Sequence, residues 1–336
     1  MLLSNTLKPW LLAPLVAVTL IGCGPTASPP DDTAGEVAVD APFVAVTQIV
    51  EHPALDAVRE GIQDELTEAG YEAGSSLTWA WESAQGQPAT ATQIAQKFVG
   101  ENPDVIVAIA TPSAQAAVAT SEDIPVVFSA VTDPVGAELV PSLDAPGEWV
   151  TGVSDLSPID QHLALIKEIA PGTTTIGVVY NAGEANSVSL VDLINAEAPE
   201  QDLTVVEATI ASSADVATAA ESLVGKVDAI YVPTDNTVVS ALESVLTVGA
   251  EHQIPVFAGD TDSVERGAIA GISFDYYDVG RQTGDLVVRI LDGEQPGNIP
   301  VETVDVLQLA VNPTAAAAMG IEIPAAVQSR ADMVFE

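Results

Sequence analysis

Short runs of consecutive apolar residues alternate with segments whose apolar residues recur at helical spacing, from about residue 42 to residue 320. One stripe consists of Leu55, Val58, Ile62 and Leu66, and this spacing predicts an amphipathic helix. The apolar runs predict strands at 43–50, 77–81, 105–110, 126–131, 150–153, 175–180, 203–210, 229–232, 255–258 and 268–273. Apolar strands that alternate with helices indicate parallel sheets covered on both faces, so the predicted fold class is α/β.

The alternation runs for about five units, passes residues 147–158, and then runs for about five more, which predicts two lobes. The remaining pattern predicts a helix at 275–291, one strand at 301–309 and a short helix at 313–320. These fragments are too few to form a third core. We therefore expect the chain to cross between the lobes three times, which makes a hinge. The predicted lobes are residues 42–153 with 275–305, and residues 154–274 with 306–336.

Polar residues follow the predicted strands at four places. They form the motifs 111–115 (TPSAQ), 132–134 (TDP), 180–187 (YNAGEANS) and 234–236 (TDN). Loops that leave the carboxyl ends of parallel strands line the ligand crevice of an α/β protein. Two motifs in each half therefore predict a cleft between two facing lobes.

Some of these residues suit a small zwitterionic ligand. Thr111 stands at an N-cap position, and the free N–H groups that follow, with Ser113 and Gln115, could hold a carboxylate. Asp235 or Asp275 could hold an ammonium group. Helix capping alone accounts for each motif taken singly. It does not account for two or more polar side chains at every one of the four strand ends.

Other positions near the predicted cleft keep two interpretations. Asp133 precedes a proline, so turn formation and ligand binding carry equal weight. Glu51 and His52 follow the first strand and are expected on the same rim. Tyr276 and Tyr277 stand at a crossing, where ring contact with a ligand and packing beside the hinge are equally well supported.

Acidic residues far outnumber basic ones, and the formal net charge is −39. Binding to nucleic acid needs Lys and Arg, so we expect no nucleic-acid partner. Excess acid with few lysines is typical of an exported protein of a salt-rich habitat, where screening weakens self-repulsion. The segment 260–265 (DTDSVE) lacks the glycine and ligand spacing of an EF-hand calcium loop, so we expect a solvated acidic loop and no metal site.

The N-terminal segment predicts export. Lys8 and an apolar stretch at 10–21 precede Leu20-Ile-Gly-Cys23, which resembles a bacterial lipobox. About 12 apolar residues are too few to span a membrane. We expect residues 1–22 to be a signal peptide, Cys23 to be lipidated, and residues 23–41 to form a disordered tether.

Motifs for common enzyme chemistries are missing from the sequence. It contains no Gly-x-Ser-x-Gly elbow, no phosphate-binding loop that ends in Lys-Ser/Thr, and no His-Glu-x-x-His helix. Cys23 is the only cysteine, which excludes disulfides and cysteine-based metal sites. His162 and His252 fall in predicted helices without a partner pattern. We therefore expect a protein that binds and does not catalyse, with no cofactor.

A run of motifs resembles the ABC-transporter substrate-binding lipoproteins of the tryptophan/tyrosine-binding type. The matching motifs are 51–57 (EHPALDA), 110–115 (ATPSAQ), 124–128 (IPVVF), 130–135 (AVTDPV), 151–155 (TGVSD), 180–187 and 231–236 (YVPTDN). The resemblance covers residues 42–320. It implies the type I periplasmic-binding fold, with two Rossmann-like, flavodoxin-like lobes, three hinge crossings and a ligand between the lobes.

The resemblance also implies a set of ligand-binding positions in this sequence. They are Thr111, Ser113, Gln115, Thr132, Asp133, Asn181, Glu184, Asn186, Ser187, Asp235, Asn236, Asp275 and Tyr276. The implied function is that of a lipid-anchored solute-binding protein of an ABC importer, with a small polar solute, chiefly an aromatic amino acid, as ligand.

The implied partners are an ABC permease and its ATPase, with the membrane reached through Cys23. The expected location is the outer face of the cytoplasmic membrane or the periplasm. The alternative function is a sensory lipoprotein that presents its bound solute to a signalling receptor.

Overall fold

The computed structural model describes residues 41–336. The predicted signal peptide, Cys23 and all but the last residue of the predicted tether lie outside the described residues. Within the described part, none of the helices combines the length and the apolar character that a membrane span requires.

A six-stranded parallel sheet forms the core of the first lobe, in the order β11-β5-β4-β3-β1-β2. Its strands are β1 (Phe43–Gln48), β2 (Thr78–Ser83), β3 (Val105–Ile109), β4 (Val126–Val131), β5 (Val150–Ser154) and β11 (Glu302–Thr303). The order 2-1-3-4-5 is that of flavodoxin-like sheets. Strands β3 and β4 are buried at every residue, which agrees with cover on both faces.

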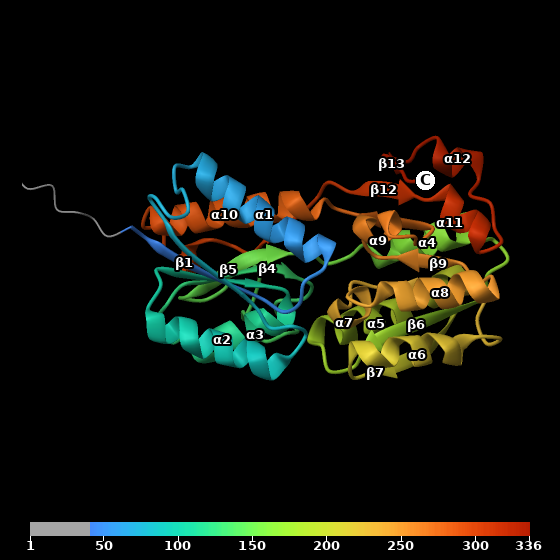
Figure 1. Cartoon of the computed structure of the whole chain (residues 1–336), viewed down its shortest axis with the longest axis horizontal. Coiled ribbons are helices and arrows are strands. Elements are labelled where there is room, and N and C mark those ends of the chain that lie inside the picture. Colours follow the sequence, from blue (N-terminus) through green and yellow to red (C-terminus); the bar gives the residue numbers. More distant parts are fainter. Residues whose placement is uncertain (1–40) are drawn as a thin grey trace, which may run out of the picture. The chain divides into compact units, whose positions relative to one another are not determined.

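Two pairs of helices cover this sheet, with α1 and α10 on one face and α2 and α3 on the other (Figure 1). Their bounds are α1 (Pro53–Glu68), α2 (Pro88–Glu101), α3 (Thr111–Thr120) and α10 (Tyr276–Leu291). Helices α1 and α10 meet through glycines. A Cβ on Gly61 would lie 2.2 Å from the Tyr277 carbonyl oxygen, and one on Gly280 would lie 2.2 Å from the Val58 oxygen. Glycine therefore allows the backbones to pack this closely.

The second lobe repeats the arrangement with a parallel sheet in the order β7-β6-β8-β9. Its strands are β6 (Thr175–Asn181), β7 (Thr204–Ile210), β8 (Ala229–Val232) and β9 (Val256–Ala258). Its helices are α4 (Ile159–Ile169), α5 (Ala185–Glu197), α6 (Val216–Leu223), α7 (Asn236–Val239), α8 (Leu242–His252), α9 (Thr261–Glu265), α11 (Pro313–Ala318) and α12 (Ala325–Gln328). This lobe also contains the short 3-10 helices η1 (Ala198–Gln201) and η2 (Ser213–Asp215). A third, η3 (Pro296–Asn298), contacts β5 in the first lobe.

A small mixed sheet joins the second lobe, in the order β10-β12-β13. Strand β10 (Ala270–Ser273) pairs antiparallel with β12 (Gln308–Val311), and β12 pairs parallel with β13 (Met333–Val334). The Ile269 amide donates to the Val256 carbonyl at 2.8 Å, so this sheet continues beside β9.

The buried apolar residues form two separate cores. One gathers residues 44–153 and 274–301, and the other gathers residues 159–270 and 309–327. The chain passes from one core to the other at residues 155–158, 274–275 and 304–307.

One predicted strand is wrong. The segment 301–309 forms β11 in the first lobe, leaves the sheet at residues 304–307, and enters β12 in the other lobe. Its content of valine, threonine and leucine fits a single strand. However, Val306 is 69% exposed, so this residue bridges the two lobes without packing in either.

Candidate functional site

A cavity lies between the two lobes, with about 340 Å³ of empty space that includes open solvent at its mouth. The lining residues come from both lobes and from two of the crossings: His52, Ala54, Leu55, Ala130, Thr132, Asp155, Asn186, Thr234, Asn236, Val239, Asp260 and Tyr276.

Asp155 is the first residue of the first crossing, directly after β5, and is 4% exposed. Its Oδ2 accepts a hydrogen bond from the Tyr276 hydroxyl at 3.0 Å, and its Oδ1 accepts one from the Thr132 hydroxyl at 3.3 Å. Burial raises the pKa of Asp155 to about 6, although the two hydroxyls oppose the shift. A buried carboxylate with spare acceptor capacity is well suited to a cationic group.

Asp260 is a second buried acid in the cavity wall, and it is 1% exposed. It caps helix α9, accepting from the Ser263 amide and the Ser263 hydroxyl, both at 2.7 Å. Burial raises its pKa as well. The expectation of a solvated loop at 260–265 is therefore wrong. The segment forms helix α9 with its N-cap, and Asp260, Thr261, Ser263 and Val264 are buried.

His52 is the N-cap residue of α1 and is 9% exposed. Its Nδ1 is buried and has no hydrogen-bond partner among residues 41–336. Burial, and then the positive charge of Arg266, lower the pKa of His52 to about 3, against a smaller opposing effect of the Asn236 side chain. The imidazole is therefore neutral at physiological pH.

Glu184 and Asp235 hold the short helix α7 in place. Asp235 Oδ1 accepts from the Val238 amide, and its Oδ2 accepts from the Asn181 amide and the Ser187 hydroxyl, at 2.6 to 2.7 Å. Burial, and then the nearby Glu184 carboxylate, raise the pKa of Asp235. Asp235 has no atom in the cavity wall.

Glu184 completes the support of α7. Its Oε2 accepts from the Asn236 side-chain amide at 2.6 Å, and its Oε1 accepts from the Thr237 hydroxyl at 2.5 Å. Asn181 adds a bond from its Nδ2 to the Thr237 hydroxyl at 3.0 Å. These contacts present Asn236 to the cavity, while Glu184 and Asn181 stay behind it.

Asn186 and Thr234 face the cavity with unsatisfied atoms. Asn186 donates to the Thr234 carbonyl at 3.2 Å, while its Oδ1 is buried and has no partner among residues 41–336. The Thr234 hydroxyl is buried and unpartnered in the same part of the chain. Buried polar atoms without partners are costly, so a ligand that bonds to them is expected.

The two hinge tyrosines have different surroundings. Tyr276 is 3% exposed, lines the cavity, and stacks edge-to-face on Phe274 with ring centroids 5.8 Å apart. The Tyr277 hydroxyl donates to Asp64 at 3.0 Å in an exposed bond on the surface. Of the two interpretations left open for these tyrosines, ligand contact suits Tyr276 and packing beside the hinge suits Tyr277.

Several predicted site residues do not line the cavity. Thr111 and Ser113 are buried with unpartnered hydroxyls at the start of α3. Gln115 is exposed and donates to the Ala137 carbonyl at 3.2 Å. Asp275 caps α10 by accepting from the Tyr277 amide at 2.9 Å.

Three further predicted residues also bond within the protein. Asp133 accepts from the Gly136 amide at 2.8 Å, which favours the turn interpretation, and from the Ser189 hydroxyl of the other lobe at 3.4 Å. Glu51 is exposed and accepts from the Gln85 side chain at 3.1 Å. Ser187 is fully buried behind the cavity wall, on Asp235.

Backbone strain marks the strand ends of the first lobe. Ala110 follows β3 with φ 72° and ψ 155°, and Ala130 lies near the end of β4 with φ 53°. Both residues carry a Cβ in a region that favours glycine, and such strain gathers at functional sites. Ala130 lines the cavity beside Thr132.

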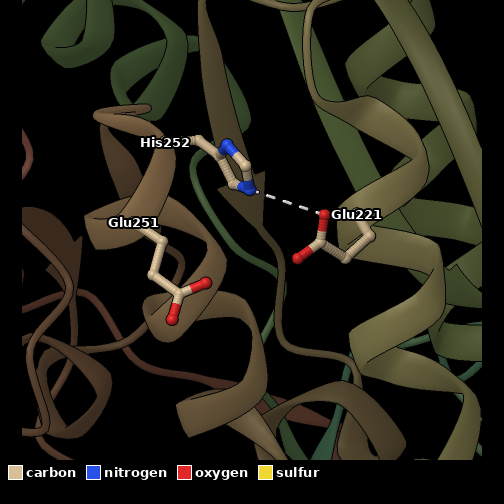
Figure 2. A group of neighbouring side chains, drawn as sticks. All are labelled: Glu221, Glu251 and His252. Atoms are coloured by element: carbon tan, nitrogen blue, oxygen red, sulfur yellow. Dashed lines mark ion pairs between the residues drawn. The ribbon is translucent and has the colours of Figure 1, made fainter.

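A second cluster of ligating side chains lies outside the cavity wall. Glu221, Glu251 and His252 are exposed near the ends of α6 and α8 (Figure 2). His252 Nε2 lies 3.5 Å from Glu221 Oε2, and Glu251 is not joined to this pair (Figure 2). Exposed acidic groups are frequent in so acidic a chain, and we assign no function to this cluster.

Thr234 stands in the strand-end motif 234–236 but is not among the ligand-binding positions that the resemblance implies. Sequence reasoning did not select Asp155 or Asp260 as site residues. Asp155 follows β5 directly and Asp260 follows β9 within two residues, so the strand-end rule that selected the four motifs could have found both. Leu55 was counted as part of a core stripe, and its place in the first turn of α1 brings it to the cavity.

Comparison with known proteins places the chain in a family. The family model described as "ABC transporter substrate binding protein" matches residues 43–335. A protein named tyrosine-binding protein from Clostridioides difficile is 42% identical over 269 residues, which cover 80% of this chain and 78% of that protein.

Solved structures agree with this result. A conserved domain protein from Vibrio cholerae is 53% identical, with a TM-score of 0.86. A domain from Streptococcus pneumoniae in complex with L-Trp is 35% identical, with a TM-score of 0.85. A ligand-free, open substrate-binding protein from Clostridium difficile is 41% identical, with a TM-score of 0.66. Each comparison covers 88% of this chain and 99% of the other. This chain therefore belongs to the ABC transporter substrate-binding proteins and has the type I periplasmic-binding-protein fold.

Proposed function

We propose that this substrate-binding protein takes a free α-amino acid, preferably an aromatic one, into the cavity between its lobes. The observation that carries the proposal is the pair of buried carboxylates, Asp155 and Asp260, in the wall of this cavity. Among residues 41–336, no lysine or arginine lines this cavity. Two buried acids in a wall without a basic side chain favour a ligand with an ammonium group over a sugar or an anion.

The aromatic preference has two supports. Part of the cavity lining is apolar, made by Ala54, Leu55 and Ala130 of the first lobe and Val239 of the second, and the Tyr276 ring adds to it. The second support is kinship, because one relative is named for tyrosine and one solved relative holds L-Trp. The unsatisfied Asn186 Oδ1 and Thr234 hydroxyl are well placed to bond to a phenol or indole edge.

The arrangement of the two lobes is more similar to that of a ligand-bound relative than to that of an open one. The TM-score is 0.85 with the L-Trp complex, and 0.66 with the ligand-free, open relative, although the open relative has the higher sequence identity. We propose that the two lobes open about the three crossings and close on the ligand, as in other hinge proteins.

Delivery of the ligand completes the proposed function. We propose export by the signal peptide, lipidation at Cys23, and a place on the outer face of the cytoplasmic membrane or in the periplasm. The closed protein would then dock on an ABC permease with its ATPase. Family membership does not favour the sensory alternative, and we propose no catalytic activity.

The net charge of −39 also has a proposed meaning. We propose that the protein works in concentrated salt, where screening weakens repulsion between its exposed acids. Unfolding measured from low to molar salt tests this point. Stability should rise with salt concentration, and a flat or falling response would contradict it.

Isothermal titration calorimetry with the twenty amino acids tests the binding proposal. The protein is first unfolded, dialysed and refolded in high salt to remove any ligand that co-purifies. We expect tyrosine, tryptophan or phenylalanine to bind in the micromolar range or tighter, and lysine and glutamate to bind at least about 100-fold more weakly. If no amino acid binds more tightly than about millimolar, the proposed function is wrong.

A further inference from the structure

We infer that the carboxylate of the ligand docks at the N-terminus of α1, on the main-chain amides of Ala54 and Leu55 with the His52 imidazole as a neutral third donor. This inference rests on the proposed function and adds an orientation to it. It differs from the sequence-based expectation, which placed the carboxylate at the start of α3.

The first turn of α1 is open to the cavity. The helix has 16 residues, and its N-cap His52 makes no side-chain capping bond. The first amide with a helical acceptor is that of Asp56, which donates to the His52 carbonyl at 2.9 Å. Pro53 has no N–H, so Ala54 and Leu55 supply the free donors. Both residues line the cavity and are 3% exposed.

His52 supplies a second and independent sign of a ligand. It lines the cavity, it is 9% exposed, and its Nδ1 is buried without a partner among residues 41–336. A buried ring nitrogen beside two free amides is costly unless something accepts from it. A carboxylate can accept from all three groups at once, and the helix dipole favours it at this end.

The other helices that start at the cavity have acidic N-cap residues: Glu184 at α5, Asp235 at α7, Asp260 at α9 and Asp275 at α10. Asp235 caps α7 through the Val238 amide, and Asp260 caps α9 in the same manner. Glu184 makes no side-chain capping bond on α5 and accepts instead from the Asn236 and Thr237 amides. A ligand carboxylate at any of these ends would meet negative charge. At α1 the N-cap is His52, and the acid of its first turn, Asp56, is paired with Arg59 at 3.0 Å.

Helix α3 is the remaining competitor. Its first turn holds the unpartnered hydroxyls of Thr111 and Ser113. Neither residue lines the cavity, and Pro112 removes one of the first-turn amides. The start of α3 is therefore the natural negative control for the start of α1.

Arg266 gives the α1 end a positive surrounding without entering the cavity wall. Its guanidinium is paired with Glu243 at 2.9 and 3.0 Å, and its charge still disfavours a protonated His52. A neighbour that opposes a proton on His52 favours a negative ligand group beside it.

The decisive variant replaces the ligand carboxylate with one from the protein. In His52→Asp, the new side chain is a strong N-cap that accepts from the free amides of α1. We expect the unliganded protein to become more heat-stable and its affinity for L-tyrosine to fall about 100-fold, through lost donors and like-charge repulsion. L-Tyrosinamide, which lacks the carboxylate, should lose less than about threefold.

The chain offers a matched control. Gln87 is likewise an N-cap residue before a proline, on α2, with no side-chain capping bond, and it is exposed outside the cavity wall. Gln87→Asp should therefore raise stability while the affinity for tyrosine stays the same. The double variant Thr111→Val with Ser113→Ala should leave the ratio of tyrosine to tyrosinamide affinity unchanged.

Two results would overturn the inference while the proposed function stands. One is an equal loss of tyrosine and tyrosinamide in His52→Asp. The other is a collapse of the affinity ratio in the α3 double variant. If the wild-type protein binds no amino acid, the proposed function fails first and this inference fails with it.

Discussion

The starts of α1 and α7 both face the same cavity, and they differ in whether acidic side chains accept hydrogen bonds from their first-turn amides. At α7, Asp235 and Glu184 occupy the amides, so the helix end is neutralised from within the protein. At α1, the N-cap is a neutral histidine and the amides of the first turn stay open. An end that is capped by an acid presents acceptors and excludes anions, whereas an open end presents donors.

The same contrast extends to the whole cavity wall. Asp155 and Asp260 supply acceptors at the first crossing and in the second lobe, while His52, Ala54 and Leu55 supply donors from the first lobe. A zwitterion whose two charges sit on one carbon atom matches such a wall. The five predictions below alter one side of this contrast at a time, and begin with the largest expected effect.

Removing the charge of Asp155 should weaken binding the most. In Asp155→Asn, the affinity for tyrosine should fall about 100-fold, because the ligand ammonium loses a buried counter-charge. The control Asp160→Asn, on the exposed side of α4, should bind as the wild type does. Calorimetry on both variants checks this, and unchanged affinity in Asp155→Asn would place the ammonium elsewhere.

The same variant should stabilise the empty protein. The folded-state pKa of Asp155 is about 6, above its unfolded value, so ionisation of this group opposes folding above about pH 6. The penalty builds up between about pH 4 and pH 6 and reaches about 3 kcal/mol. Denaturant unfolding of Asp155→Asn at pH 7.5 should therefore give a higher free energy of unfolding, and a lower one would contradict the burial argument.

Acidification should weaken binding, as the second largest effect. Below about pH 6 the Asp155 carboxylate of the empty site takes up a proton, so affinity should fall by up to tenfold per pH unit. His52 stays neutral over this range, because its pKa is about 3. Titrations between pH 7.5 and pH 5 measure the slope, and Asp155→Asn should show a markedly smaller slope than the wild type.

Loss of the support under α7 should have an intermediate effect. Glu184→Ala leaves the Asn236 and Thr237 amides without their acceptor, so the free energy of unfolding should fall by about 1 to 3 kcal/mol. Affinity should fall several-fold, because Asn236 is no longer held at the cavity. Glu184→Gln keeps part of the bonding and should lie between the two proteins. Equal behaviour of all three would mean that α7 is held by packing alone.

The smallest effect is expected at the contact between Ser189 and Asp133. This bond of 3.4 Å joins the two lobes at the rim. Ser189→Ala should lower ligand affinity by less than about threefold and leave unfolding unchanged, because a long, part-buried bond adds little to the closed state. A tenfold loss of affinity would show that rim contacts, and not the cavity, dominate closure.

Much of the fold is readable from local signals. Strand β3 is apolar at every residue, and Asp275 stands as an N-cap directly before α10, so both elements are predicted close to their observed bounds. The segment 301–309 is the exception. Its strand-like composition is continuous along the sequence, and the strand is interrupted only because the chain passes from one lobe to the other within it.

The site is less readable for a physical reason. Asp235 and Asp260 occupy the same kind of position, an N-cap after a strand, and their local sequence signals do not differ. Asp235 accepts from Asn181 and Ser187 of a neighbouring strand and helix and turns away from the cavity, whereas Asp260 bonds only within its own turn and faces it. Tertiary neighbours decide which way each acid points, and a strand-end rule does not contain them.

Asp155 and Tyr276, joined at 3.0 Å, belong to the first crossing and to the helix that follows the second. The groups that we propose to recognise the ligand thus also lie at the crossings about which we propose that the lobes turn. Specificity and the rate of release are therefore linked at this end of the cavity, and a substitution here changes both together. Engineering for a new side chain would be directed at Leu55, Val239 and Thr234, where the wall can be reshaped while the pivot stays intact.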